Sequence, residues 1–293
     1  MRLLIIILDT LRVLAIGNSF SIDALETEFY PVCREAGIEL VVGNLYYGGC
    51  SLRQHAEFLD SKAPVYSYRT IIDDVRTQTD SVNMLAALDD RRWDIISLQQ
   101  ASHDSGDRTT FEPYLSRLID SVYAHQPQAR LVWHQTWAYQ HDAKHPDFPR
   151  YQSSQQVMYD SIESCTTFAL QILNLKSSFL NLQSPIFNLQ SSIPSDRASL
   201  KQRILNLQSP ILVPSGRAIQ RARATSLGDT FCRDGYHLNH LYGRYTAALT
   251  WLEALTGYDC RKIRYRATDD NGKKMTKKQR RIISAAVHST CNP

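Results

Sequence analysis

The sequence predicts an α/β fold in which a parallel sheet is covered by helices on both faces. Short apolar runs with β-branched residues alternate along the chain with segments whose apolar residues recur at helical spacing. Each run is apolar almost throughout, which is typical of a parallel strand buried on both faces. Ligands of such sheets bind at the carboxyl ends of the strands, so the residues that follow each strand are the expected location of a functional site.

The elements follow one another in the order that this fold requires. The segment Leu11–Gly17 (LRVLAIG) is a short apolar run with a glycine exit, which predicts a buried first strand. A helix is expected next, with Asp23 as its cap and Gly37 as its stop, although Pro31 argues against one unbroken helix. A strongly amphipathic helix is expected at 241–257. Further strands are expected at 38–49, 93–100 and 129–137, and a further helix at 111–125.

A segment at about 170–212 has a biased composition, rich in Leu, Asn, Gln and Ser, and repeats the unit NLQSPI at 181–186 and 206–211. Solenoid repeats usually run about 20–50 residues each, so these short, uneven copies indicate a low-complexity insertion. We expect a loop there; a repeated ligand-binding element is the rival interpretation. The expected organisation is one domain over 1–258 with this interruption, followed by a basic extension over 259–293.

The extension contains a predicted helix from Lys277 to His288 with Thr276 as its cap. Such a basic run is usually the solvated face of a helix, and no nucleic-acid-binding module surrounds it. The formal net charge of +4 over 293 residues is small, so no nucleic-acid partner is expected; DNA or RNA binding through this helix is the minority interpretation. The basic residues are Lys273, Lys274, Lys277, Lys278, Arg280 and Arg281.

Composition argues against several other classes of protein. The six cysteines form no C-x-x-C pair, which argues against a disulfide framework or a zinc site. The histidines show no metal-ligand spacing, so neither a metal nor another cofactor is expected. The N-terminal apolar run at 3–8 is short for a signal peptide, and no run reaches the about 20 residues of a membrane span. The sequence leaves compartment and oligomeric state open.

Polar residues follow three of the expected strands. Gly-Asn-Ser, ending in Ser19, follows the first; Gly-Gly-Cys-Ser follows the second and Gln-Gln-Ala-Ser the third. Near the end of the chain, Asp234 precedes His237 by three residues, a spacing at which a tight loop lets the carboxylate orient the imidazole. We therefore expect Ser19 as nucleophile, His237 as general base and Asp234 as the group that orients the base.

Acyl transfer also needs donors for the developing oxyanion. The backbone N–H of Ser19 lies at a strand-to-helix turn, Gly49 can present its N–H with no side chain in the way, and Gln100 carries an amide group at the exit of the third strand. We expect these three donors to form an oxyanion hole. The expected lining of the substrate site is Asn18, Gln99, Trp137 and Tyr139.

The blocks IGNSFS, YGGCS and DGYHLN resemble those of the SGNH (GDSL-like) hydrolases, with Asn18 in place of the usual aspartate. Together with LQQAS and TWAY they look most like an uncharacterised SGNH-like domain family, over roughly 11–257 outside the insertion. The resemblance implies a three-layer α/β/α sandwich of the flavodoxin-like kind, with a parallel sheet of about five strands. It also implies metal-free ester hydrolysis, with a small acyl group such as acetyl on a carbohydrate as the substrate, and it is compatible with secretion or a periplasmic location.

One departure from the family pattern concerns the third block, where SGNH enzymes supply an asparagine and LQQAS has none. Gln100 is the expected substitute and Gln99 the second choice, because neighbouring strand positions face opposite ways. Each motif taken singly also has a structural interpretation, such as Ser19 as a helix cap and His237 as a surface histidine. A catalytically silent carbohydrate-binding or scaffold protein on the same fold is the alternative function.

Overall fold

The computed structural model describes residues 10–183 and 210–293, which contain a mixed sheet of seven strands in the order β4-β3-β2-β1-β5-β6-β7. Five of these strands run parallel, as the sequence predicts, and β3 and β4 are antiparallel additions at one edge. The strands are Leu11–Gly17 (β1), Leu40–Tyr46 (β2), Tyr66–Ile72 (β3), Val75–Val82 (β4), Ile95–Leu98 (β5), Arg130–His134 (β6) and Ile211–Val213 (β7).

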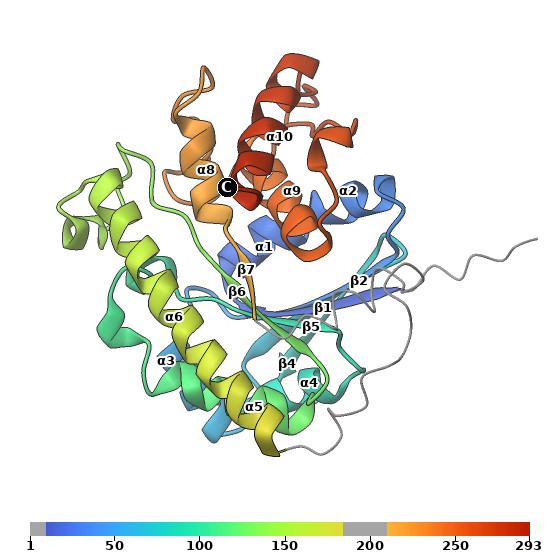
Figure 1. Cartoon of the computed structure of the whole chain (residues 1–293), viewed down its shortest axis with the longest axis vertical. Coiled ribbons are helices and arrows are strands. Elements are labelled where there is room, and N and C mark those ends of the chain that lie inside the picture. The colour runs from blue at the N-terminus through green and yellow to red at the C-terminus, as the bar shows by residue number, and fades with distance from the viewer. Residues whose placement is uncertain (1–9, 184–209) are drawn as a thin grey trace, which may run out of the picture.

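Helices cover both faces of the sheet, which confirms the α/β fold class (Figure 1). One face packs against α1 (Ser19–Leu25), α2 (Phe29–Glu35), α8 (Ser215–Arg223), α9 (Gly243–Thr256) and α10 (Lys277–Cys291). The other face packs against α3 (Leu52–Asp60), α4 (Met84–Asp89), α5 (Tyr114–His125) and α6 (Gln155–Gln183). Short 3-10 helices are η1 (Ser102–Asp104), η2 (Arg108–Thr110), η3 (Phe148–Tyr151) and η5 (Cys260–Lys262).

The centre of the sheet is the point where the strand order reverses. From β1 the chain first adds β2 on one side and later adds β5 on the other side of β1. In open α/β sheets the crevice at such a switch point, outside the carboxyl ends of the strands, is the usual binding site. The turn that leaves β1 at Gly17 therefore opens into the position where a ligand is expected.

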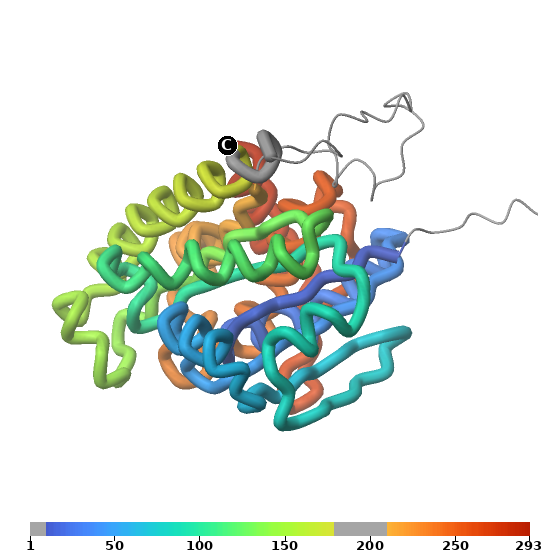
Figure 2. The backbone as a smooth tube through the Cα atoms, turned by 90° about the horizontal axis from the view of Figure 1, so that it is seen from below, coloured from blue at the N-terminus to red at the C-terminus, as the bar shows by residue number. Residues whose placement is uncertain are grey.

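The antiparallel hairpin of β3 and β4 is absent from the sequence-based prediction of a parallel sheet. It forms one edge of the sheet, seen at the lower right in Figure 2. Seven of the eight residues of β4 are exposed, and Val75 is 63% exposed. A solvated strand carries no apolar run, so it lacks the signal that predicts the other strands.

The helix expected after β1 is in fact two helices. Asn18 caps α1, so the helix begins before the predicted cap Asp23, which lies inside it and is buried. The break before α2 places Pro31 in the first turn of that helix, where its missing N–H costs no hydrogen bond. Gly37 ends α2 with a φ of 75°, as expected.

The predicted insertion begins inside a helix rather than in a loop. Helix α6 runs for 29 residues to Gln183. Its residues Ile172 and Leu173 are buried in the apolar cluster between the sheet and helices α3, α4 and α5. The remainder of the repeat region, 184–209, lies outside the described residues. None of the helices in residues 10–183 and 210–293, the long α6 included, combines the length and hydropathy of a bilayer span.

The C-terminal extension packs onto the body of the molecule. Thr276 and Gln279 form a capping box at the start of α10, and Ile283 and Val287 are buried in the same apolar cluster as α9. Because α10 covers its outer side, α9 is buried on nearly all faces, whereas the sequence predicts a strongly amphipathic helix. Most side chains of the basic cluster are exposed.

Candidate active site

Ser19 is the first residue of α1 and directly follows the β1 turn. The side chain of Asn18, not that of Ser19, caps the helix: Asn18 Oδ1 accepts a hydrogen bond from the Phe20 N–H at 3.0 Å. The simple capping interpretation of Ser19 is therefore wrong, and its hydroxyl is available for another partner.

That partner is His237, a residue 218 positions away in the chain. Ser19 Oγ lies 2.8 Å from His237 Nε2, and His237 Nδ1 lies 2.6 Å from Asp234 Oδ2. Because a carboxylate only accepts, Nδ1 carries the proton and Nε2 is free to accept from the Ser19 hydroxyl. The structure thus brings together the three side chains that the sequence analysis singled out for acyl transfer.

Asp234 is held in the ionised form that this tautomer requires. Its other oxygen, Oδ1, accepts from the backbone N–H of His237 at 2.8 Å and of Tyr236 at 3.2 Å. Partial burial alone would raise its pKa, but the hydrogen bonds from the His237 side chain and from the two backbone N–H groups outweigh burial and lower the pKa.

The loop that carries Asp234 and His237 is closed by backbone contacts. Arg233 N–H donates to the His237 carbonyl at 2.8 Å, and Cys232 pairs with Leu238 in an isolated antiparallel bridge. Gly235 has a φ of 92°, and a Cβ there would lie 3.0 Å from Ala143. A residue with a side chain would strain this turn, so the glycine permits the close spacing of the acid and the imidazole.

Two backbone N–H groups remain as candidate oxyanion donors. The N–H of Ser19 is at the first position of α1, where no intrahelical acceptor exists. Gly49 lies in the turn after β2 with a φ of 63°, and within the part of the chain that the structure describes no acceptor contacts its N–H. Both turns leave the carboxyl ends of neighbouring strands.

Gln100 does not fit the role of the third donor. Its amide nitrogen donates to the carbonyl of Thr110 at 3.1 Å and to the Thr110 hydroxyl at 3.0 Å. Its amide oxygen accepts from the backbone N–H of Leu52 at 2.9 Å and of Ala101 at 2.8 Å. Both amide hydrogens are engaged, so the side chain fixes loops next to the site instead of facing a substrate.

Gln99 is the glutamine that contacts the turn holding Ser19. Its Nε2 donates to Asn18 Oδ1 at 2.9 Å, and Asn18 Nδ2 in turn donates to the carbonyl of Cys50 at 3.0 Å. Asn18 therefore ties the turn that holds Ser19 to the turn that holds Gly49. Gln99 and Asn18 are each 2% exposed, so both act from beneath the site and not as open substrate contacts.

The expected aromatic lining is also buried. Trp137 and Tyr139 are both 0% exposed, and Trp137 stacks on Phe20 with ring centroids 4.1 Å apart. The indole N–H of Trp137 donates to the Tyr236 carbonyl at 2.7 Å, so this ring supports the loop of Asp234 and His237 from the interior. The expectation that the two rings offer a surface to the substrate is not met, because a fully buried ring has none to offer.

Half-buried rings lie beside His237 instead. The Tyr236 ring centroid is 4.3 Å from that of His237, and the His145 centroid is 4.8 Å from that of Tyr236. Burial lowers the pKa of His145; nearby His103 and His237 act in the same direction, and Asp147 opposes them. The position of His145 beside these rings is not predictable from the sequence, because no motif links it to the site.

Further residues that contact the candidate site lie in the interior, and none of these contacts was predicted. His134 and Ser215 continue the hydrogen-bond chain from Gln99, and Asp23 binds the loop of His237. Their partners lie on other elements far along the chain, so no local pattern identifies them.

Within residues 10–183 and 210–293, one group of histidine and carboxylate side chains is close enough to share a metal ion: Glu253, Asp259 and His288. These groups already bind one another and a guanidinium. His288 Nδ1 lies 2.6 Å from Glu253 Oε1, and Arg261 pairs with Asp259 at 2.8 Å. We interpret the group as an ion-pair network that fastens α10 to α9.

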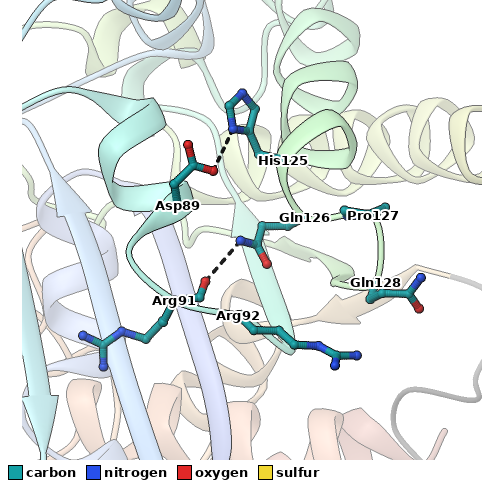
Figure 3. A pocket seen from close by; sticks show the side chains of 7 residues that line it. All are labelled: Asp89, Arg91, Arg92, His125, Gln126, Pro127 and Gln128. Carbon is teal, nitrogen blue, oxygen red and sulfur yellow. Dashed lines mark hydrogen bonds and ion pairs between the residues drawn. The ribbon is translucent and has the colours of Figure 1, made fainter.

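A surface pocket of about 380 Å³ lies at the opposite ends of the strands (Figure 3). It is lined by residues that precede β5 and β6, at the amino-terminal edge of the sheet. It is therefore separate from the crevice that holds Ser19. Its lining residues are Asp89, Arg91, Arg92, His125, Gln126, Pro127 and Gln128.

Comparison with known proteins agrees with this fold. The crystal structure of a DUF4886 family protein from Bacteroides uniformis ATCC 8492 is 33% identical in sequence, with a TM-score of 0.78, over 96% of this chain and 95% of that one. A protein from Slackia heliotrinireducens, provisionally described as an SGNH hydrolase, is 19% identical with a TM-score of 0.50, over 84% of this chain and 99% of that one. The latter likeness shows a shared α/β fold.

No curated protein sequence matches the chain. The profile of the family described as "Domain of unknown function (DUF4886)" matches residues 12–182 and 188–288. This match covers most of the chain and agrees with the likeness to the Bacteroides uniformis structure. The chain therefore belongs to the DUF4886 family.

Proposed function

We propose that the protein is a serine ester hydrolase that transfers an acyl group from its substrate to water. Ser19 is the nucleophile, His237 the general base and Asp234 the carboxylate that orients the base. The observation that carries the proposal is the unbroken pair of hydrogen bonds, 2.8 and 2.6 Å long, from Ser19 through His237 to Asp234. Its place outside the carboxyl end of β1, at the switch point of the sheet, supports it further.

In the proposed reaction Ser19 Oγ attacks the ester carbonyl carbon while His237 Nε2 takes the hydroxyl proton. The π pair of the carbonyl moves to its oxygen and forms a tetrahedral oxyanion. Collapse of this intermediate breaks the bond to the alcohol oxygen, which leaves with the proton from His237. Water, deprotonated by the same imidazole, then attacks the acyl-serine, and Ser19 Oγ recovers its proton as the acid departs. Asp234 stays ionised throughout.

The proposed oxyanion hole consists of the backbone N–H groups of Ser19 and Gly49. Asn18 supports this assignment because its side chain connects the two turns that carry the donors. Gln100 is not included, since both hydrogens of its amide are engaged by Thr110. Removing one donor from such a hole costs about 10²–10³ in rate, so the orientation of these two groups matters to the proposed catalysis.

The proposed substrate is a carbohydrate whose hydroxyl group is esterified with a small acyl group, such as acetyl. This choice rests on the resemblance of the motifs to SGNH esterases and on the half-buried ring of Tyr236 beside His237. A half-buried tyrosine combines an apolar ring with a polar hydroxyl, which suits contact with a sugar.

The test is covalent labelling of the pure protein with a fluorophosphonate probe, followed by mass spectrometry of the labelled peptide. We expect one adduct at Ser19, none in Ser19→Ala, and full labelling in Ser61→Ala, whose exposed hydroxyl lies at the end of α3. Hydrolysis of p-nitrophenyl acetate faster than of the butyrate or octanoate would support the small acyl group. A folded protein that is neither labelled nor active would contradict the proposal.

A catalytically silent carbohydrate-binding protein on the same fold is the second candidate. The engagement of Gln100 away from the site favours it, because the predicted third oxyanion donor is missing. This candidate predicts carbohydrate binding that persists in Ser19→Ala, together with no labelling and no hydrolysis by the unmodified chain.

A further inference from the structure

We propose that Asp23 is a positioning residue that clamps the loop of Asp234 and His237 onto helix α1 and thereby sets the distance between His237 and Ser19. The inference rests on the proposed function, since it concerns the geometry of the same site. It adds a residue that no motif assigns to the reaction.

Asp23 lies on the same face of α1 as the nucleophile. Ser19 and Asp23 are four residues apart, a spacing that places two side chains one above the other on a helix. Asp23 is 0% exposed. A carboxylate removed from water in this way must find charged or hydrogen-bonding partners, so its contacts are structurally demanding.

Among the described residues, the partners of the Asp23 carboxylate lie in the loop or at the start of α9. Its Oδ2 accepts from the backbone N–H of Leu238 at 2.7 Å. Its Oδ1 pairs with Arg233 Nη1 at 2.9 Å and with Arg244 Nη2 at 2.7 Å. Arg233 directly precedes Asp234 and Leu238 directly follows His237. A single carboxylate therefore holds both ends of the segment that carries the acid and the imidazole.

The two arginines extend the clamp to neighbouring elements. Arg233 Nη1 also donates to the Leu238 carbonyl, and Arg244 Nε donates to the same carbonyl at 3.4 Å. Arg244 Nη1 donates to Thr27 Oγ1 at 2.8 Å, just beyond the end of α1. The loop is thus joined to α1 through Asp23 and to α9 through Arg244, and it cannot shift relative to Ser19 without breaking its contacts with the Asp23 carboxylate.

The contacts of Asp23 hold the loop more firmly than the exposed Asp234 side chain can. The Asp234 side chain is 40% exposed, so solvent competes with its hydrogen bond to His237. The Asp23 carboxylate is 0% exposed, so water does not compete for its oxygen atoms. Misplacement of a catalytic group by about 1 Å can cost about 10²-fold in rate, so holding the backbone of the imidazole is of catalytic value.

The test compares Asp23→Asn with Glu253→Gln. Glu253 is a matched control because it is also a buried carboxylate, 4% exposed, and pairs with a histidine on α10 without contacting the loop. We expect Asp23→Asn to lower kcat on p-nitrophenyl acetate about 10²-fold with KM little changed. Glu253→Gln should leave both constants near those of the parent protein.

Two readouts separate positioning from a merely structural role. In the unmodified protein, NMR should show a downfield Nδ1 proton of His237 and slow hydrogen exchange at the Leu238 amide. We expect Asp23→Asn to broaden or lose the former and to accelerate the latter, and Glu253→Gln to change neither. If the unmodified chain is neither labelled at Ser19 nor active, the proposed hydrolase function is wrong, and these two readouts still test the clamp.

Arg233→Met is the second variant if Asp23→Asn does not fold. The Arg233 side chain is 36% exposed, and Met keeps much of its apolar stem, so the body of the protein should fold. We expect a smaller loss of kcat and a smaller rise in Leu238 exchange than in Asp23→Asn. Folded variants with unchanged kcat, unchanged His237 resonance and unchanged Leu238 exchange would overturn the proposal.

Discussion

His134 Nδ1 lies 3.0 Å from the amide oxygen of Gln99, in the interior beneath the turn that holds Ser19. An amide oxygen only accepts, so Nδ1 is the donor, and His134 Nε2 accepts from the Ser215 hydroxyl at 3.0 Å. Burial lowers the pKa of His134 to about 3, which keeps the ring neutral and its two nitrogens in these opposite roles. The chain of bonds continues through Gln99 to Asn18 and fixes the orientation of the Asn18 amide.

The two adjacent glutamines should respond differently to truncation. Gln99→Ala removes the contact that orients Asn18, so we expect a fall in kcat of at least about tenfold, since small misplacements are costly. Gln100→Ala leaves two backbone N–H groups without acceptors and should lower the free energy of unfolding by about 1–3 kcal/mol with kcat largely kept. Steady-state kinetics and urea unfolding of both variants decide this. A larger loss of kcat in Gln100→Ala would return that residue to the oxyanion hole.

Asp234→Asn should be far more harmful to turnover than to folding. An amide NH₂ facing His237 Nδ1 favours the tautomer with the proton on Nε2, which cannot accept from Ser19. We expect kcat to fall by about 10³–10⁴ with little change in thermal stability. The control is Asp142→Asn, an exposed acid in the neighbouring loop. Equal activity of the two variants would argue against the proposed role of Asp234.

Glu28 makes stability depend on pH in a direction opposite to most carboxylates. Burial raises its pKa from the ordinary 4.5 to about 7, against a hydrogen bond from Tyr265 and the charge of Arg244. The folded state therefore binds this proton more tightly than the unfolded state. The resulting stabilisation is fully present below about pH 4.5 and is lost as the pH rises through about 7.

We therefore expect Glu28→Gln to gain stability over the parent protein by roughly 2–3 kcal/mol more at pH 8 than at pH 5. Urea unfolding of both proteins at the two pH values measures this difference. Glu57→Gln, a change at an exposed acid on α3, should show no such pH-dependent gain. A constant difference between Glu28→Gln and the parent would show that Glu28 is already ionised when buried.

Two buried tryptophans allow a matched test of whether an indole hydrogen bond stabilises the loop of Asp234 and His237. The indole N–H of Trp137 donates to the Tyr236 carbonyl, whereas that of Trp251 has no partner among the described residues. Both side chains are 0% exposed, so the change to Phe removes a similar volume in each. We expect Trp137→Phe to cost about 1–3 kcal/mol more in free energy of unfolding than Trp251→Phe, measured by urea titration. An equal cost would show that the Tyr236 contact adds no stability.

Four of the five parallel strands could be predicted because each is buried on both faces and so reads as a continuous apolar run. The fifth, β7, was not located, because it has only three residues and two of them fall within the expected insertion at about 170–212. The limits of β1 match the prediction residue for residue. The β3 and β4 strands could not be found in this way. Buried residues of β3 alternate with polar ones such as Ser67 and Arg69, and β4 is solvated along nearly its whole length. An edge hairpin carries no uniform apolar signal.

The candidate site was predictable where its residues follow a predicted strand, as Ser19 does, or share a short motif, as Asp234 and His237 do. It was not predictable where residues contribute from the interior. Asp23 was assigned as a helix cap because a carboxylate near an expected helix start has that local meaning. Its partner Arg233 is 210 residues away, and only the fold brings the two together. The choice between Gln99 and Gln100 depends on the face of the sheet to which each side chain points at the end of β5. The sequence shows that neighbouring residues point to opposite faces, but not which residue points to which face.

The spacing of Ser19 and Asp23 also restricts how the gene of this protein can change. Each residue of a helix advances the side-chain direction by about 100°. Inserting or deleting one codon between these two positions would therefore turn the carboxylate away from the arginines and from the Leu238 amide, even though every other residue stayed in place. The number of residues between these two positions is therefore fixed, even where their amino-acid types can vary.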